Sequence, residues 1–134
     1  VNFYDVFKPN NRWNELVQSA MERIRNGESP NNVFDLVDSF SEGFAIVELN
    51  GKCNFINTEG ELLSPNQWFD GIGSFTEGFA VIVLNRKWNF INTEGNLLSP
   101  NQWFDDVDNF SEGFADVQLN GKWFKIDKEG RIVT

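Results

Sequence analysis

The chain has 134 residues, a length typical of one domain rather than two. Of these residues 40% are hydrophobic and 23% charged, a composition typical of a globular chain rather than a disordered one. Its formal net charge of −9 disfavours binding to a phosphate backbone, and no apolar run is long enough to predict membrane insertion. With no histidine and the single cysteine Cys53, the sequence excludes an intrachain disulfide, cysteine-based metal sites and the commonest general base.

The first 28 residues predict a helix. Apolar residues that recur there at helical spacing would form one face: Trp13, Leu16, Val17, Ala20 and Ile24. Asn10 or Asn11 can cap the start, and Gly27 stands where a left-handed residue commonly ends a helix. We expect residues 1–28 to form a helical cap over the first of the repeats that follow; a helix that recognises a partner is the alternative.

From Ser29 to Val133 the sequence consists of three tandem copies of a 35-residue unit, residues 29–63, 64–98 and 99–133. The copies align without gaps, and the 35 residues that begin at Phe40 are identical at 24 positions to the 35 that begin at Phe75. Self-similarity at a fixed period of this size is typical of a repeat array in which each unit buries a face against a neighbour.

Each copy predicts a β-hairpin. An alternate set of positions is apolar in all copies, as a half-buried strand requires: Ala45, Val47 and Leu49; Ala80, Ile82 and Leu84; Ala115, Val117 and Leu119. Asn50-Gly51 and Asn120-Gly121 then predict a type I′ turn, whose two central residues need positive φ. Asn85-Arg86 stands there in the second copy, where we expect the same turn under some strain.

The return strand of the second copy should cover residues 87–92, and a turn at Thr93-Glu94-Gly95 leads into a short third strand, Leu97-Leu98. Ile56, Ile91 and Ile126 of the return strands should join the buried set. The predicted fold class is therefore mainly β: a tandem array of three β-meander units with an N-terminal capping α-helix.

The third copy has the features of a solubilising end. Lys125 stands where the earlier copies have Phe55 and Phe90, and Lys128 replaces a threonine. A terminal repeat needs a polar outer face because no further repeat covers it.

The patterns of acidic residues and of the single cysteine favour structural roles over catalysis or metal binding. Two sets of acids recur at equivalent places: Glu42, Glu77 and Glu112 before glycine, and Asp35, Asp70 and Asp105 after phenylalanine. An enzyme needs one asymmetric site, so we expect these carboxylates to accept bonds from N–H groups of turns and strand ends. The acids of residues 105–108 are not repeated and predict a solvated turn rather than a Ca²⁺ site. Cys53 occupies the position of Trp88 and Trp123, which predicts a buried, inert thiol. No catalytic residue, metal site or cofactor is predicted.

Several motifs at fixed spacing resemble the bacterial WG repeat, also called the KWG repeat. The likeness covers residues 29–133 and rests most directly on Glu112-Gly113-Phe114-Ala115 and Leu119-Asn120-Gly121-Lys122-Trp123. The glycine of the Trp-Gly pair is replaced by Asn54, Asn89 and Phe124 in the successive copies. The resemblance implies a β-rich array of uncharacterised or interaction function, and it implies no catalytic residue.

The leading functional hypothesis is a non-enzymatic module that binds a protein partner, since several equivalent patches can each add a small contact. The alternative is a carbohydrate- or cell-wall-binding module with stacked tryptophan rings, and an acidic mimic of nucleic acid comes third. The candidate binding surface consists of Trp68, Trp103, Phe44, Phe79, Phe114, Glu48 and Gln118, with Trp88 and Trp123 as a second row. Packing of these tryptophans between repeats is the competing interpretation.

Overall fold

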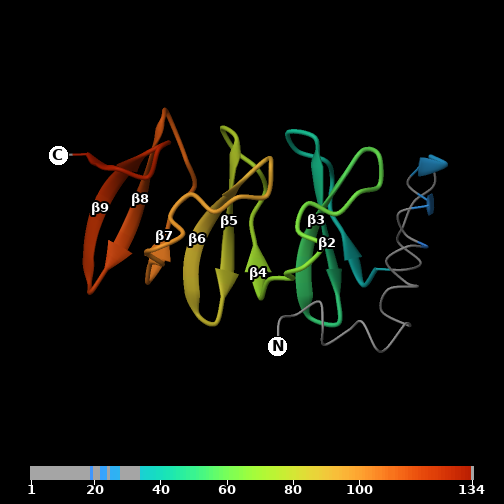
Figure 1. Cartoon of the computed structure of the whole chain (residues 1–134), viewed down its shortest axis with the longest axis horizontal. Coiled ribbons are helices and arrows are strands. Elements are labelled where there is room, and N and C mark those ends of the chain that lie inside the picture. The colour runs from blue at the N-terminus through green and yellow to red at the C-terminus, as the bar shows by residue number, and fades with distance from the viewer. Residues whose placement is uncertain (1–18, 20–21, 24, 28–33, 134) are drawn as a thin grey trace. The chain divides into compact units, whose positions relative to one another are not determined.

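The computed structural model describes residues 19, 22, 23, 25–27 and 34–133 (Figure 1). They contain ten strands: β1 Leu36–Val37, β2 Phe44–Leu49, β3 Lys52–Asn57, β4 Gly71–Ile72, β5 Phe79–Leu84, β6 Lys87–Asn92, β7 Asp106–Val107, β8 Phe114–Leu119, β9 Lys122–Asp127 and β10 Ile132–Val133. The chain divides into two compact units, Val1–Phe69 and Asp70–Thr134. In the described part, the first unit holds the sheet of the first repeat, and the second unit holds those of the second and third repeats.

Each sheet is built around one antiparallel hairpin, and the strand orders are β1-β2-β3, β4-β5-β6 and β10-β9-β8-β7. The register repeats from hairpin to hairpin, with Ala45 opposite Ile56, Ala80 opposite Ile91 and Ala115 opposite Ile126. Directly opposed residues of an antiparallel pair point to the same side of the sheet, so the alternate apolar residues of both strands share one face. The prediction of a mainly β, three-repeat fold is confirmed.

The hairpin turns have the predicted geometry in all three repeats. Asn50 and Gly51 have φ of 53° and 79°, as a type I′ turn requires. In the second repeat Asn85 and Arg86 have φ of 53° and 66°. Arg86 thus adopts the left-handed conformation that glycine occupies in the other two turns, and a side chain there is strained.

The predicted third strand of the meander is correct only in the last repeat. There β10 pairs with β9, whereas in the first two repeats the pairing is reduced to single bridges, Ile56 with Leu62 and Ile91 with Leu97. The pairing stops because a Ser-Pro sequence follows at once, and proline has no N–H to donate to a ladder.

The third strand of the first two sheets comes instead from the segment that precedes each hairpin. Strands β1, β4 and β7 pair with β2, β5 and β8 respectively. They are two residues long and follow no alternating pattern, so the sequence offers no signal for them. At the other edge, Trp88 and Phe104 exchange backbone bonds of 2.9 Å, so the start of the third repeat extends the sheet of the second.

The predicted apolar face is the core. Ala45, Val47 and Ile56 have no exposed surface, and Ile91 and Ile126 are each 1% exposed. Leu84 and Leu119, at the hairpin ends, are only half-buried. Cys53 is buried, as predicted.

Within the second unit, the two sheets lie side by side (Figure 1, β4 to β9) and share one core. Val81 and Phe90 of the β5–β6 hairpin pack with Val107, Phe110, Ala115, Val117 and Ile126 of the third repeat. Val81 and Phe90 belong to the face of their sheet opposite to the one that carries Ala80 and Ile82, because side chains alternate along a strand. Each sheet of such a pair therefore contributes a different face to the contact.

The outer face of the third repeat has the polar substitutions expected of an end. Asp116 and Lys125, opposite each other on β8 and β9, replace the pair Val81 and Phe90, and Lys125 Nζ lies 3.4 Å from Asp116 Oδ1. Large apolar side chains remain partly exposed around this ion pair, including Phe114 at 39% and Trp123 at 48%.

The N-terminal cap predicted over residues 1–28 lies almost wholly outside the described residues, and a capping helix is not confirmed. Among the few residues described there, Asn26 N donates to Glu22 O at 3.1 Å, and Gly27 has a φ of 77°. No helix of the described residues is long and apolar enough to cross a membrane.

Candidate functional site

The predicted tryptophan surface is not formed as one row. Trp68 is 2% exposed, so its ring is not available to a ligand. Trp103 and Trp88 are half-buried, and Trp123 is 48% exposed. Trp68 therefore has to be removed from the candidate surface, because its ring is packed inside the protein.

The predicted phenylalanines lie in two kinds of environment. The Phe79 ring stacks on that of Phe110 in the next repeat, with centroids 4.8 Å apart, and Phe44 makes an edge contact with Phe55. Phe114, in the last repeat, is 39% exposed, and Lys125 Nζ lies 5.9 Å from its ring centroid. Phe79 thus holds two repeats together, whereas Phe114 presents its ring to solvent.

Glu48, Val83 and Gln118 are half-buried and occupy one position of the repeat. Each is opposed on both sides: Val83 lies opposite Gly71 of β4 and Trp88 of β6. Gly71, Val83 and Trp88 therefore form a row on one face of the second sheet. All three residues of this row line a pocket in the second unit.

A groove with a volume of about 370 Å³ lies along this row. We call it the second-repeat groove; it is lined by Gly71, Ile72, Gly73, Val81, Val83, Trp88, Val107, Asp108 and Asn109. One side is the sheet of the second repeat, and the other is strand β7 with the two residues that follow it. Its volume is at the small end of the range of ligand pockets in proteins.

The two glycines that line the groove are not required by the fold. Neither Gly71 nor Gly73 has positive φ, and a Cβ atom at Gly71 would meet Val83 at an ordinary 3.7 Å. The first repeat carries Leu36 at the position of Gly71, and that leucine is 47% exposed. Since neither backbone conformation nor crowding calls for glycine here, the effect of the glycines is to leave the groove open.

The second repeat differs from the other two at just these positions. The residues that correspond to Gly71, Gly73 and Val83 are Leu36, Asp38 and Glu48 in the first repeat and Asp106, Asp108 and Gln118 in the third. Trp88 belongs to the surface predicted from the sequence, whereas Gly71 and Gly73 were not predicted because they do not recur between the copies. The available signal was the departure of the second copy, where two side chains are deleted and the third is apolar.

The repeated aspartates bond the hairpin turns, as predicted. Asp35, Asp70 and Asp105 each accept a 2.8 Å bond through Oδ2 from a turn N–H, those of Asn50, Asn85 and Asn120 respectively. Asp105 also pairs with Lys87, whose Nζ lies 2.6 Å from Oδ1. The bond from Lys87, together with that from Asn120 N, lowers the pKa of the Asp105 carboxyl below its ordinary value.

Glu77 joins two repeats through a turn. Its carboxylate accepts bonds from Glu112 N at 2.6 Å and Gly113 N at 2.8 Å, and Lys128 Nζ lies 3.4 Å from Oε1. The Gly113 N–H is the main cause that lowers the pKa of Glu77. This carboxylate is thus committed to the loop of the third repeat.

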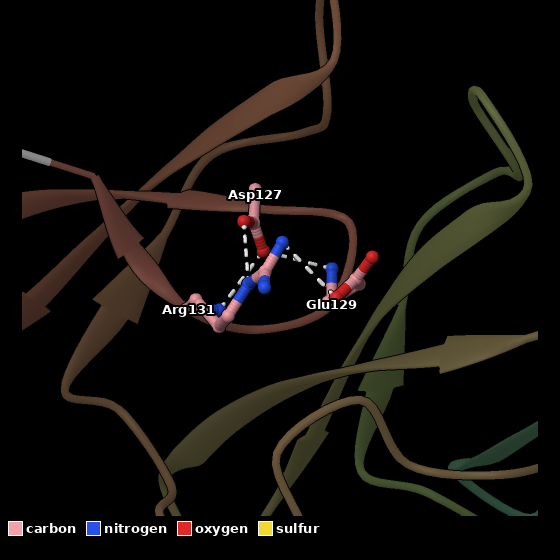
Figure 2. Close-up of polar contacts among 3 residues, drawn as sticks. All are labelled: Asp127, Glu129 and Arg131. Carbon is pink, nitrogen blue, oxygen red and sulfur yellow. Dashed lines mark hydrogen bonds and ion pairs between the residues drawn. The ribbon is translucent and has the colours of Figure 1, made fainter.

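Asp127 organises the last turn in the same manner (Figure 2). Its Oδ1 accepts from Glu129 N and Arg131 N at 2.9 and 3.0 Å, and Arg131 Nε lies 3.1 Å from Oδ2. These bonds, that of Arg131 N foremost, lower the pKa of Asp127. Arg131 also reaches Glu129, with Nη2 3.0 Å from Oε2.

Asn54 and Asn89, which replace the glycine of the Trp-Gly pair in the first two repeats, are buried and anchor the segment that follows each hairpin. Asn89 has no exposed surface; its Nδ2 donates to Ser99 O at 2.8 Å, and its Oδ1 accepts from Phe90 N at 2.8 Å and Ser99 N at 3.3 Å. Asn54 makes the same contacts with Ser64 and Phe55. Each amide therefore fixes the start of the next repeat to the hairpin.

No group of three or more acidic or cysteine side chains in the described part of the chain is arranged to hold a metal ion. Asp105, Asp106 and Asp108 follow one another along β7 and its ends, but Asp105 is taken by Lys87, and Asp106 Oδ1 accepts from Val107 N at 2.8 Å.

A family model described as WG containing repeat matches residues 33–53, 55–88 and 90–123. The curated proteins contain no match to the chain. Among solved structures, the chain is similar to a protein of unknown function from Bacteroides caccae, with 15% sequence identity and a TM-score of 0.35. That similarity covers 79% of this chain and 50% of the other, so the chain spans about half the length of that structure.

Proposed function

Because the chain belongs to the family of WG-containing repeat proteins, we propose that it is a non-enzymatic repeat module that binds a protein partner through the second-repeat groove. The observation that carries the proposal is the pair Gly71 and Gly73, which open a groove in one repeat although the fold itself does not need glycine at either position. A glycine inside a strand often marks a place where another chain or a ligand approaches closely.

The positions of the carboxylates support binding rather than catalysis. The repeated aspartates perform one identical task in each repeat, and Glu77 is bonded to a loop. General acid–base chemistry needs a carboxylate aimed at a reacting group in a cleft. The groove contains one carboxylate, that of Asp108, and the rest of its lining is apolar or amide.

A carbohydrate ligand is the second candidate, and Trp88 is the observation that favours it. An indole ring beside a carboxylate and an amide can hold a sugar ring. Four of the lining residues, however, are the aliphatic Ile72, Val81, Val83 and Val107, which offer no hydrogen bonds to hydroxyl groups. This composition favours a polypeptide over a sugar.

The test is photo-crosslinking in a lysate of the organism that carries the gene. A photoreactive amino acid replaces Asn109 at the rim of the groove, and in a matched protein it replaces the exposed Glu129. We expect a protein adduct from position 109 and none from position 129. Gly71→Leu should lower the adduct about tenfold, because the leucine side chain fills the partner's place.

Asn96→Leu is the matched control variant, because it adds a leucine side chain at an exposed position outside the groove lining. It should leave the adduct unchanged. A glycan array runs in parallel with the same proteins. The proposal is overturned if Gly71→Leu does not change the adduct, or if the array shows binding that Gly71→Leu abolishes while no protein adduct forms.

A further inference from the structure

We propose that the second-repeat groove binds an arginine side chain presented by an extended segment of the partner. This inference rests on the proposed function and adds to it the chemistry that the groove recognises. It is carried by the order of apolar and acidic groups along the groove, by the charge of the chain, and by the position of β4.

The groove is apolar on the side of the sheet and carries an acid and an amide on the β7 side. Val81 and Val83 supply aliphatic surface, and Trp88 adds an aromatic wall. Asp108 and Asn109, both exposed, stand on the β7 side. A long side chain with an apolar stem and a charged end fits such a site, because the stem covers aliphatic surface while the charge reaches the polar rim.

Charge complementarity selects a cation. Asp108 is the one charged residue of the lining, and no lysine or arginine lines the groove. Lys87, the basic side chain next to Trp88 on β6, is engaged by Asp105 at 2.6 Å. The net charge of −9 for the whole chain adds a field that attracts basic segments.

Arginine meets the polar groups better than lysine does. Its planar guanidinium can stack on the indole of Trp88 and donate two parallel bonds to the carboxylate of Asp108. A further N–H of the same group can donate to the amide oxygen of Asn109. A lysine ammonium is a strongly hydrated point charge and uses neither the stacking nor the forked geometry.

The position of β4 accounts for an extended segment. Strand β4 is at the edge of its sheet, in the order β4-β5-β6. An edge strand can accept an added strand through main-chain hydrogen bonds, and the glycines at 71 and 73 leave room on the groove face of β4 for a side chain of the incoming strand. The partner's backbone would therefore run along β4, with the arginine side chain in the groove.

Fluorescence anisotropy of labelled peptides tests the inference on the full chain. The peptides are short, strand-forming and otherwise uncharged, and they differ at one central residue: arginine, lysine or citrulline, which has the shape of arginine without its charge. We expect saturable binding of the arginine peptide, with citrulline about tenfold weaker or worse and lysine between them. Raising the salt concentration should weaken binding of the arginine peptide and leave the citrulline peptide unchanged.

Three variants locate the binding. Gly71→Leu should abolish it by filling the groove, and Asp108→Asn should reduce the preference for arginine over citrulline to nearly none while keeping the shape of the site. Asn96→Leu, outside the groove lining, should bind as the unchanged chain does. Thermal melting of each variant shows that a loss of binding is not a loss of fold.

Equal binding of arginine and citrulline peptides, or arginine binding that survives Gly71→Leu, overturns the inference. So does binding of chitotetraose that competes with the arginine peptide. If the groove-dependent protein adduct at position 109 persists in those cases, the proposed protein-binding function stands and only the arginine preference is lost. If the amount of adduct is the same in the Gly71→Leu variant, the proposed function is wrong, whichever peptides bind.

Discussion

Asn89 is the residue whose role is least expected from its type, because a fully buried amide is costly unless all its groups are bonded. Its donor and its acceptor both reach Ser99, at the start of the third repeat, and the acceptor also takes the Phe90 N–H. Asn54 repeats the arrangement one unit earlier. At the corresponding place in the third repeat stands Phe124.

Asn89→Ala should therefore destabilise the chain by roughly 1–3 kcal/mol or more, because it leaves buried backbone groups of Ser99 and Phe90 without their partner. Urea denaturation followed by tryptophan fluorescence measures the change. Asn96→Ala, at an exposed position in the neighbouring turn, is the matched control and should stay within about 0.5 kcal/mol. Equal effects of the two variants would contradict the anchoring role.

At the scale of the element, each hairpin depends on a turn whose residues must adopt positive φ. Gly51 and Gly121 do so at little cost, while Arg86 holds the same conformation at a φ of 66°. The strands on either side explain why the turn still forms. Val83 and Leu84 pair with Trp88 and Lys87 in the same register as in the other two hairpins, so the pairing of the strands dictates the turn.

Arg86→Gly should raise the free energy of unfolding by about 1 kcal/mol, since it relieves the left-handed strain at the cost of some entropy of the unfolded chain. The reverse exchange, Gly121→Arg, should lower it by a similar amount. Chemical denaturation of both variants beside the unchanged chain checks the pair. A stabilising Gly121→Arg would show that these turns are not governed by φ.

At the scale of the whole molecule, the second unit shows how two WG repeats pack and how the outer face of the third repeat differs from the face between them. The second repeat offers Val81, Phe90 and Phe79 to the third, and Phe110 of the third packs on them. The third repeat offers Asp116, Lys125 and Phe114 at the matching positions. The face that is apolar between repeats thus becomes an ion pair beside an exposed ring, which keeps it compatible with water.

Replacing Asp116 and Lys125 with the valine and phenylalanine of the second repeat should make the outer face of the third repeat less compatible with water. The double variant Asp116→Val, Lys125→Phe gives an apolar face that adjoins Phe114 and Trp123, and we expect concentration-dependent self-association. Sedimentation velocity measures it. The control Lys122→Phe, Glu129→Val makes the same kinds of change at exposed positions outside the Asp116–Lys125 pair. A double variant that sediments as the unchanged chain does would show that this face does not depend on the ion pair for solubility.

The sequence alone determined the repeat, its period, the hairpins and their turns, because each of these depends on residues that are close together in the chain. Alternating apolar residues predict the buried face of a strand, and Asn-Gly predicts a type I′ turn, so a few consecutive residues suffice to predict either feature. The burial of Ala45, Val47 and Ile56, and the bonding of Asp35, Asp70 and Asp105 to turn N–H groups, followed from residues that recur in every copy.

Only the tertiary structure decided what depends on neighbours from another repeat. Trp68 is 2% exposed while Trp103, at the same position of the next copy, is half-buried, so equal residues of two copies have different surroundings. The groove likewise needs Gly71 and Gly73 to lie across from Asp108 and Asn109, more than thirty positions further along the chain. No pattern within one repeat encodes that distance, and the packing of two sheets creates the site.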